Sequence, residues 1–175
     1  MSGAGPAWII EPLARHHDRK AFSCGKESLD RYLKQQARQD ARRHAAAPFV
    51  AVAGKGDSVI CGYYTLSAYG VDPGELPEAT IKKLPRYPLL PATLLGRLAV
   101  DQSQRGRGLG EFMLMDALSK ALAQSEQIAA TAVIVDALDE EAWRFYHHFN
   151  FTPFPERRDR LFLPMSAIAV LFAGR

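Results

Sequence analysis

The sequence predicts an α+β fold, an α/β/α sandwich in which helices cover both faces of a mixed sheet. Two patterns lead to this fold class: strand-like segments follow one another across a turn early in the chain, and strand and helix patterns alternate in its second half. The 175 residues, of which 47% are hydrophobic and 23% charged, suffice for a buried core. We therefore expect residues 1–175 to form one domain.

The first half of the chain predicts a strand, a helix and a hairpin. Residues 7–14 (AWIIEPLA) are typical of an opening strand, and residues 26–45 have helix-forming composition with apolar residues at helical spacing. Residues 48–54 and 59–71 are rich in β-branched and aromatic residues, and the sequence KGDS between them supplies turn residues. We expect these last two segments to pair as a hairpin.

The second half predicts alternating elements after a proline-rich connection. Residues 71–91 carry five prolines, which exclude one long helix and favour a short helical piece. The segments that follow are, in order, a buried strand at 92–101, an amphipathic helix at 108–124, a buried strand at 131–137, a helix at 139–149, and closing strands at 151–154 and 160–164.

Composition and charge exclude several classes of protein. The net charge of +3 is too small to indicate nucleic-acid binding by itself. Cys24 and Cys61 form no CxxC pair and match no zinc spacing, so we expect reduced thiols and no metal. Apolar runs such as 129–135 are shorter than the roughly 18 residues of a membrane span, and residues 1–13 lack the basic start of a signal peptide. These features predict a cytoplasmic protein without a membrane segment.

Residues 105–110 (RGRGLG) carry glycines at alternate positions between a predicted strand and a predicted helix. A P-loop needs lysine after its last glycine, but Gly110 is followed by Glu111. A dinucleotide-binding turn needs its last two glycines three residues apart, whereas these are two apart. Bare backbone N–H groups at the positive end of a helix suit a pyrophosphate, and a merely flexible turn is the alternative.

The Arg-x-x-Gly-x-Gly pattern of residues 105–110 resembles the acetyl-coenzyme A loop of the GNAT family of N-acetyltransferases. More narrowly, the chain resembles the toxins of bacterial type II toxin–antitoxin modules that acetylate the α-amino group of aminoacyl-tRNA and block translation. The resembling segments are 22–43, 62–71, 87–101, 142–151 and 161–168. One departure is Asn150, where glycine is expected; asparagine tolerates the left-handed backbone of a helix end.

The resemblance implies where acetyl-coenzyme A binds. The cofactor is expected in a splay between two central parallel strands that contain residues 97–100 and 132–135, and no metal is implied. Its pantetheine arm is expected on the backbone of Leu98, Ala99 and Val100. Its pyrophosphate is expected on Arg105, Gly106, Arg107, Gly108, Leu109 and Gly110. A backbone N–H near Ala99 or Val100 would stabilise the oxyanion of the tetrahedral intermediate.

The resemblance also implies that Tyr146 protonates the departing thiolate. A tyrosine of ordinary pKa, near 10, is protonated at neutral pH and so can act as a general acid. The residue pattern alone favours a core aromatic. The neighbouring aromatic residues expected to face the core are Trp143, Phe145 and Phe149. His147 and His148 point about 100° apart on a helix, so we expect surface positions rather than a metal site. No carboxylate is marked as a general base.

A helical wheel of residues 26–45 gathers basic and polar side chains on one face: Arg31, Lys34, Gln35, Arg38 and Arg42. Asp30 and Asp40 fall off this face, so pairing within the helix neutralises little of it. A solvated surface is the plainer interpretation, but tRNA phosphates would also bind here. Arg97, a charge inside the apolar segment LLGRLAV, needs a partner or a wet cleft; we expect it to line the tRNA acceptor groove, with an ion pair as the alternative.

Two other classes of function remain open from the sequence. An acetyltransferase for a small amine or a protein N-terminus would share the glycine loop and Tyr146 without needing the basic face. A non-catalytic acyl-coenzyme A-binding module would need the loop but not Tyr146. The toxin interpretation implies a cognate antitoxin of the ribbon-helix-helix class, DNA contact only through the antitoxin complex, and leaves a homodimer open.

Overall fold

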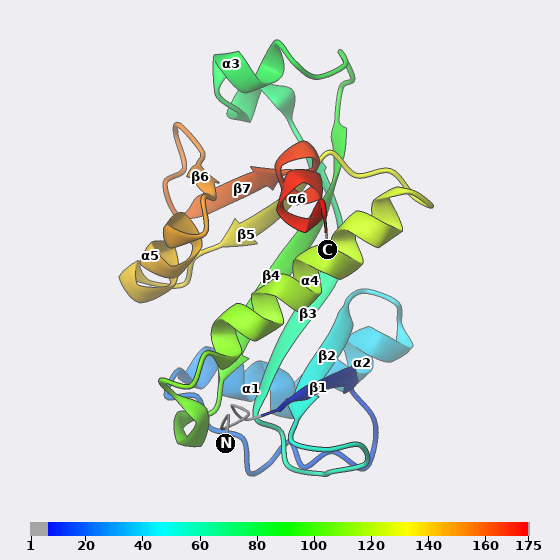
Figure 1. Cartoon of the computed structure of the whole chain (residues 1–175), viewed down its shortest axis with the longest axis vertical. Helices are drawn as coiled ribbons and strands as arrows, with labels where there is room; N and C mark the ends of the chain where they lie inside the picture. Colours follow the sequence, from blue (N-terminus) through cyan, green and yellow to red (C-terminus); the bar gives the residue numbers. More distant parts are fainter. Residues whose placement is uncertain (1–6, 175) are drawn as a thin grey trace. The chain divides into compact units, whose positions relative to one another are not determined.

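The structure, a computed structural model, describes residues 7–174; residues 1–6, part of the segment examined for a signal peptide, and residue 175 lie outside it. Its elements are β1 (Ile9–Pro12), α1 (Glu27–Gln35), α2 (Ala37–Arg42), β2 (Ala47–Val52), β3 (Gly62–Val71), η1 (Pro73–Glu75), α3 (Glu78–Ile81), β4 (Leu90–Val100), η2 (Gln102–Gln104), α4 (Leu109–Ser125), β5 (Ala132–Asp136), α5 (Glu140–His148), β6 (Thr152–Pro153), β7 (Arg160–Pro164) and α6 (Met165–Phe172) (Figure 1). Within residues 7–174 the strands form one mixed sheet of order β1-β2-β3-β4-β5-β7-β6, which confirms the predicted fold class.

The chain divides into two compact units, each described by itself. Unit 1 contains residues 1–66 and 97–117, and unit 2 contains residues 67–96 and 118–175. Three elements, β3, β4 and α4, run from one unit into the other. Among the described residues no helix has the length and apolar character needed to cross a membrane.

Unit 1 contains the predicted hairpin. β2 pairs antiparallel with β3 from Ala47↔Leu66 to Ala51↔Gly62, and β1 pairs antiparallel with β2. The turn between β2 and β3 includes Gly56, whose φ of +85° favours glycine. The helices pack on these strands through a cluster of buried side chains, among them Phe22, Leu33, Ala37, Val50 and Tyr63.

The single helix predicted over residues 26–45 is wrong, because the chain breaks between α1 and α2 at Gln36 (φ −122°, ψ −33°) (Figure 1). The sequence has neither proline nor glycine there to signal a break. The carboxylate of Asp40 instead fixes the bend, accepting hydrogen bonds from the Tyr32 hydroxyl at 2.7 Å and the Gln36 amide at 2.8 Å. These side-chain contacts span the break, and helical periodicity alone does not reveal them.

Unit 2 contains the parallel pair and the closing strands. β4 pairs parallel with β5 from Thr93↔Val133 to Leu95↔Val135, and β4 then runs on to Val100, past this register. β5 and β6 each pair antiparallel with β7, as predicted for the closing strands. Residues 71–91 contain two short helical pieces, η1 and α3, where one was predicted. α6 was not predicted, although Pro164 before it and Gly174 after it are typical helix-boundary residues.

Candidate functional site

The glycine loop, residues 105–110, leads directly into α4. Gly106 and Gly108 have φ values of +75° and +85°, and a Cβ built at either would have no other heavy atom within 4 Å. Leu109, at the start of α4, is 1% exposed and fixes the end of the loop in the core of unit 1. The loop therefore presents bare backbone at its two turning glycines, next to the positive end of a helix of 17 residues.

The two arginines of the glycine loop differ in what they contact. The Arg105 guanidinium donates to the Cys24 carbonyl at 2.7 Å, so one of its N–H groups is already engaged. Arg107 is exposed and donates to the Gln104 side chain at 2.9 Å. Both arginines are exposed, but Arg105 is joined to the main chain of a distant segment, whereas Arg107 contacts a side chain three residues away.

The backbone expected to hold the pantetheine arm, Leu98 to Val100, forms the end of β4 within unit 1. Ala99 is buried, and its carbonyl approaches Gly62 so closely that a Cβ at Gly62 would lie 2.9 Å from it. Asp101 follows β4, and its backbone N–H donates to the Cys61 carbonyl at 2.8 Å. Sequence reasoning missed Gly62, although a glycine inside a strand is a recognised sign of close backbone approach.

Tyr146 is the buried residue of α5, at 5% exposure. Trp143, Phe145 and Phe149, which were expected to face the core, are each partly buried, so Tyr146 is the most buried aromatic residue of the helix. The Tyr146 ring packs against Phe151 with the ring centroids 5.5 Å apart. Burial, together with the negative charge of Asp136, raises the pKa of Tyr146 well above its ordinary value. The hydroxyl is therefore held protonated, the form that a general acid requires.

Local capping explains the position of α5. Asp139 accepts from the Ala142 N–H at 2.9 Å and begins the helix, as the acidic start predicts. Asn150 ends it with φ +70°, which confirms the left-handed position expected for this residue. His147 and His148 are both exposed, as predicted. Tyr146 belongs to unit 2, whereas the glycine loop belongs to unit 1.

A partly buried ion pair lies at the end of β5 and was missed by sequence reasoning. Arg160 is 8% exposed, and its guanidinium donates to both carboxylate oxygens of Asp136, at 2.7 and 3.1 Å. The two residues are cross-strand partners in the β5–β7 pairing, and Arg160 also donates to the Tyr69 hydroxyl. The pairing fixes the Asp136 side chain at the end of β5, and Asp136 adds to the effect of burial in raising the pKa of Tyr146.

Arg97 stacks on an aromatic ring, and no ion pair of its guanidinium is found within residues 7–174. Its guanidinium carbon lies 3.5 Å from the centroid of the Tyr32 ring, a cation–π arrangement within unit 1. Hydrogen bonds from Gln36 and from the Tyr32 hydroxyl lower the pKa of Asp40, and the charge of Arg97 acts in the same direction. Arg97 is half-buried, so its role in an acceptor groove stays a prediction.

The predicted basic face is spread over two helices because of the break at Gln36. Arg31 and Lys34 lie on α1, and Arg38 and Arg42 lie on α2. Arg31, Lys34 and Arg42 are exposed, and Arg38 is half-buried. The wheel of one continuous helix therefore does not describe their arrangement, but their charges remain accessible to phosphates.

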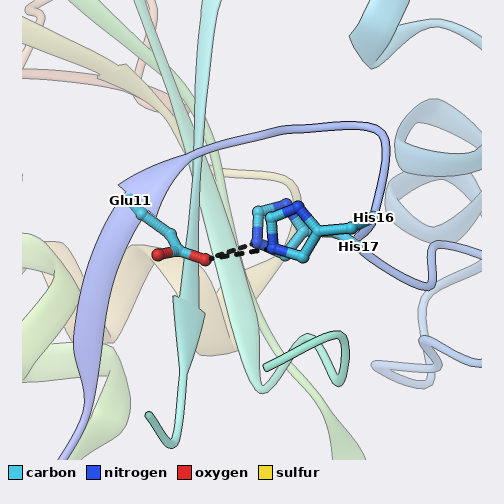
Figure 2. A group of neighbouring side chains, drawn as sticks. All are labelled: Glu11, His16 and His17. Carbon is cyan, nitrogen blue, oxygen red and sulfur yellow. Dashed lines mark hydrogen bonds and ion pairs between the residues drawn. The ribbon is translucent and has the colours of Figure 1, made fainter. Parts of the chain in front are cut away.

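Glu11, His16 and His17 bring potential metal ligands within 4.8 Å of one another, and both imidazole rings turn toward the same carboxylate (Figure 2). Hydrogen bonding argues against a metal there. His17 Nδ1 accepts from the Ala14 N–H at 2.9 Å, so the ring proton lies on Nε2, which is 2.6 Å from Glu11 Oε1. A metal-binding nitrogen must be free of its proton, and ligating histidines normally donate through the other nitrogen. These residues therefore fit a structural hydrogen-bonded group.

Comparison with known proteins defines the class. The family described as "Acetyltransferase (GNAT) family" matches residues 11–151, and this chain belongs to that family. A protein of Sinorhizobium fredii named "Probable toxin TacT" is 32% identical over 98% of this chain and 99% of its own. A protein of Mycobacterium tuberculosis named "tRNA-acetylating toxin" is 35% identical over 77% of this chain and 78% of its own.

Solved structures share the fold over nearly the whole chain. AtaT complexed with acetyl-methionyl-tRNAfMet has a TM-score of 0.87 and 29% identity, covering 95% of this chain and 99% of that one. A tyrosine-to-phenylalanine mutant of AtaT, bound to acetyl-CoA and the C-terminus of the antitoxin AtaR, has a TM-score of 0.79 and 26% identity, covering 95% and 98%.

Proposed function

We propose that this chain is an acetyl-coenzyme A-dependent N-acetyltransferase toxin that acetylates the α-amino group of aminoacyl-tRNA and blocks translation. One observation carries the proposal: a chain of this family, matched over its length by relatives named as toxins, keeps an open glycine loop at the start of α4. Residues 1–175 act as one acetyltransferase domain, since the family match at 11–151 includes residues of both units.

The chain's residues take these roles in cofactor binding. The backbone of Leu98, Ala99 and Val100 holds the pantetheine arm. The bare N–H groups of the glycine loop, from Arg105 through Gly106, Arg107, Gly108 and Leu109 to Gly110, hold the pyrophosphate. When bound, acetyl-coenzyme A supplies an activated acetyl thioester. Open space around Gly106 and Gly108 and the exposed positive charges of Arg105 and Arg107 support this assignment.

Tyr146 acts as the general acid. The neutral amine attacks the thioester carbon, the C–N bond forms, and the C–S bond breaks as the tetrahedral oxyanion collapses. A backbone N–H near Ala99 or Val100 stabilises that oxyanion, and Tyr146 donates its proton to the departing thiolate. The phenol of Tyr146 enters the reaction protonated, as a tyrosine does at neutral pH. The acceptor's α-amine is already partly neutral near pH 7, so water suffices to take its proton.

The tRNA is held by Arg31, Lys34, Arg38, Arg42 and Arg97, mostly through phosphates. By analogy with the AtaT–AtaR complexes, one of which is bound to DNA, a cognate antitoxin of the ribbon-helix-helix class neutralises the protein, and DNA is contacted only through that complex. We place the protein in the cytoplasm, where its substrate is made.

Mass spectrometry of tRNA after incubation with the protein and acetyl-coenzyme A tests the proposal. We expect one acetyl group on the aminoacyl moiety of charged tRNA and none on uncharged tRNA. Free amino acids, polyamines and a peptide with a free N-terminus serve as competing acceptors in parallel reactions. Acetylation of these acceptors with charged tRNA left unmodified would overturn the assignment of substrate.

A further inference from the structure

The turn formed by residues 23–25 is joined by hydrogen bonds to the segment that leads into the glycine loop. The Asp101 carboxylate accepts from the Ser23 N–H at 2.9 Å, and the Gln102 N–H donates to the Ser23 carbonyl at 2.9 Å. Both partners lie in unit 1, although 78 residues separate Ser23 from Asp101 in sequence. The 23–25 turn therefore fixes the backbone immediately after β4.

The same turn receives the first arginine of the glycine loop. The Arg105 guanidinium donates to the Cys24 carbonyl at 2.7 Å. Gly25, with φ +88°, leaves the room for it: a Cβ there would lie 2.8 Å from Arg105 Nη2 and 2.9 Å from Gln102 Nε2. These two atoms are the ends of flexible side chains, so a larger residue at position 25 would displace the guanidinium rather than the backbone.

The turn is itself held from the other side. Phe22, 1% exposed, packs edge-on against Tyr63 with ring centroids 5.5 Å apart. The Cys24 N–H donates to Asp30 Oδ1, on α1, at 2.9 Å. Contacts within residues 22–30 (FSCGKESLD) thus hold the Cys24 carbonyl and Gly25 in place. The proposed function gives these contacts no role.

We propose that the 23–25 turn is a receptor for the Arg105 side chain, and that Gly25 and Asp30 are positioning residues of the acetyl-coenzyme A site. Docking of Arg105 on the Cys24 carbonyl sets the path of the loop before the cofactor arrives. A preset loop binds without the cost of ordering its backbone. The role of Arg105 in cofactor binding is then to position the N–H groups of Gly106 and Gly108. The inference rests on the proposed function in taking acetyl-coenzyme A as the ligand of this loop.

Gly25→Ala and Gly56→Ala form a matched pair for the test. Both glycines have nearly the same positive φ, +88° and +85°, so the backbone strain of alanine is similar in the two variants. A Cβ at Gly56 meets no other heavy atom within 4 Å, whereas that at Gly25 meets Arg105. Calorimetric titration of the full chain with acetyl-coenzyme A should give a Kd about tenfold higher for Gly25→Ala than for Gly56→Ala, the effect of losing a hydrogen bond to a charged group.

A double-mutant cycle with Arg105→Ala shows whether Gly25 acts through the arginine. In the Arg105→Ala background, Gly25→Ala should weaken cofactor binding no further than Gly56→Ala does. In turnover, Gly25→Ala should raise KM for acetyl-coenzyme A with kcat unchanged. Equal Kd values for the two glycine variants, or additive effects of Gly25→Ala and Arg105→Ala, would overturn the inference. Failure of the wild-type chain to bind acetyl-coenzyme A would instead overturn the proposed function.

A second pair of variants covers the case in which Gly25→Ala does not fold. Asp30→Ala removes the acceptor for the Cys24 N–H. Asp18→Ala removes an equivalent acceptor, for the Lys20 and Ala21 N–H groups, in a neighbouring turn that does not receive Arg105. We expect Asp30→Ala to raise the Kd for acetyl-coenzyme A several-fold and Asp18→Ala to leave it unchanged. Equal Kd values in these two variants would contradict a positioning role for Asp30.

Discussion

The glycine loop and helix α5 carry the two chemical tasks of the proposed reaction, and they are built in opposite ways. The loop presents exposed backbone with open space at Gly106 and Gly108, whereas α5 buries the hydroxyl-bearing side chain of Tyr146. Binding at the loop requires that positions 106 and 108 carry no side chain, because a side chain there would occupy the space proposed for the ligand. Chemistry at α5 depends on one atom that is present, the phenolic oxygen, and on surroundings that keep it protonated. Additions should therefore damage the loop, and deletions should damage α5.

The largest expected effect follows from adding atoms to the loop. Gly108→Asp places a side chain and a negative charge in the space meant for pyrophosphate, so calorimetry with acetyl-coenzyme A should detect no binding. Gly56→Asp is the matched control, with the same φ of +85° and open surroundings outside the loop. The control should bind normally. Unchanged affinity in a folded Gly108→Asp protein would show that the loop does not hold the cofactor.

Removing one atom from α5 should have the next largest effect. Tyr146→Phe deletes the hydroxyl and should lower kcat by about 10² to 10⁴, the usual contribution of a general acid, with acetyl-coenzyme A affinity preserved. Tyr87→Phe, which removes the same atom from a tyrosine that is 58% exposed, is the control and should keep wild-type turnover. A wild-type kcat in Tyr146→Phe would show that Tyr146 is only a core aromatic residue and that another group is the general acid.

Neither region should determine how the tRNA is held, and this can be tested with salt. Replacing Arg31, Lys34, Arg38 and Arg42 by glutamine should raise KM for charged tRNA and lower the slope of log KM against log salt by about 3 to 4, since each phosphate contact contributes about 0.7 to 0.9. Affinity for acetyl-coenzyme A should not change.

A charge-matched control separates specific contacts from net charge in that experiment. Neutralising four other exposed basic residues (Lys55, Lys82, Lys83 and Arg157) removes the same total charge. This second variant should retain most of the salt dependence of the wild-type protein. Equal slopes in the two variants would mean that the four residues on α1 and α2 form an ordinary solvated surface.

The smallest expected effect concerns the pH at which the Tyr146 hydroxyl ionises. Burial, with the charge of Asp136 adding to it, raises the pKa of Tyr146, so the folded state favours the neutral phenol. The stability from this residue is therefore complete below the ordinary tyrosine pKa of about 10 and is lost as pH rises above it toward the folded value. Ultraviolet difference titration of wild type against Tyr146→Phe should show no phenolate from Tyr146 by pH 10. Half-ionisation near pH 10 would indicate an unperturbed side chain.

The sequence by itself determined the elements and the open loop. Hairpin residues, alternating patterns and helix boundaries are local signals, so β2, β3, β4, β5 and α5 were predictable from neighbours in the chain. The left-handed backbone at Asn150 followed from residue type in the same way. The motifs of residues 87–101 and 105–110 also sufficed to point to the family. Each of these features can be recognised from residues that are close together in the sequence.

The tertiary structure decided which side chains these elements bury and what they meet. Periodicity did not reveal that Asp40 would fix a break in the first helix, or that Tyr146 rather than Phe145 would be buried. The Arg105–Cys24 and Arg160–Asp136 contacts join residues 81 and 24 positions apart. Such pairs arise only when strands and turns pack together, because a residue's own neighbours carry no information about a partner that distant in the chain. The burial that raises the pKa of Tyr146 and the hydrogen bond that holds Arg105 are therefore features of the folded chain.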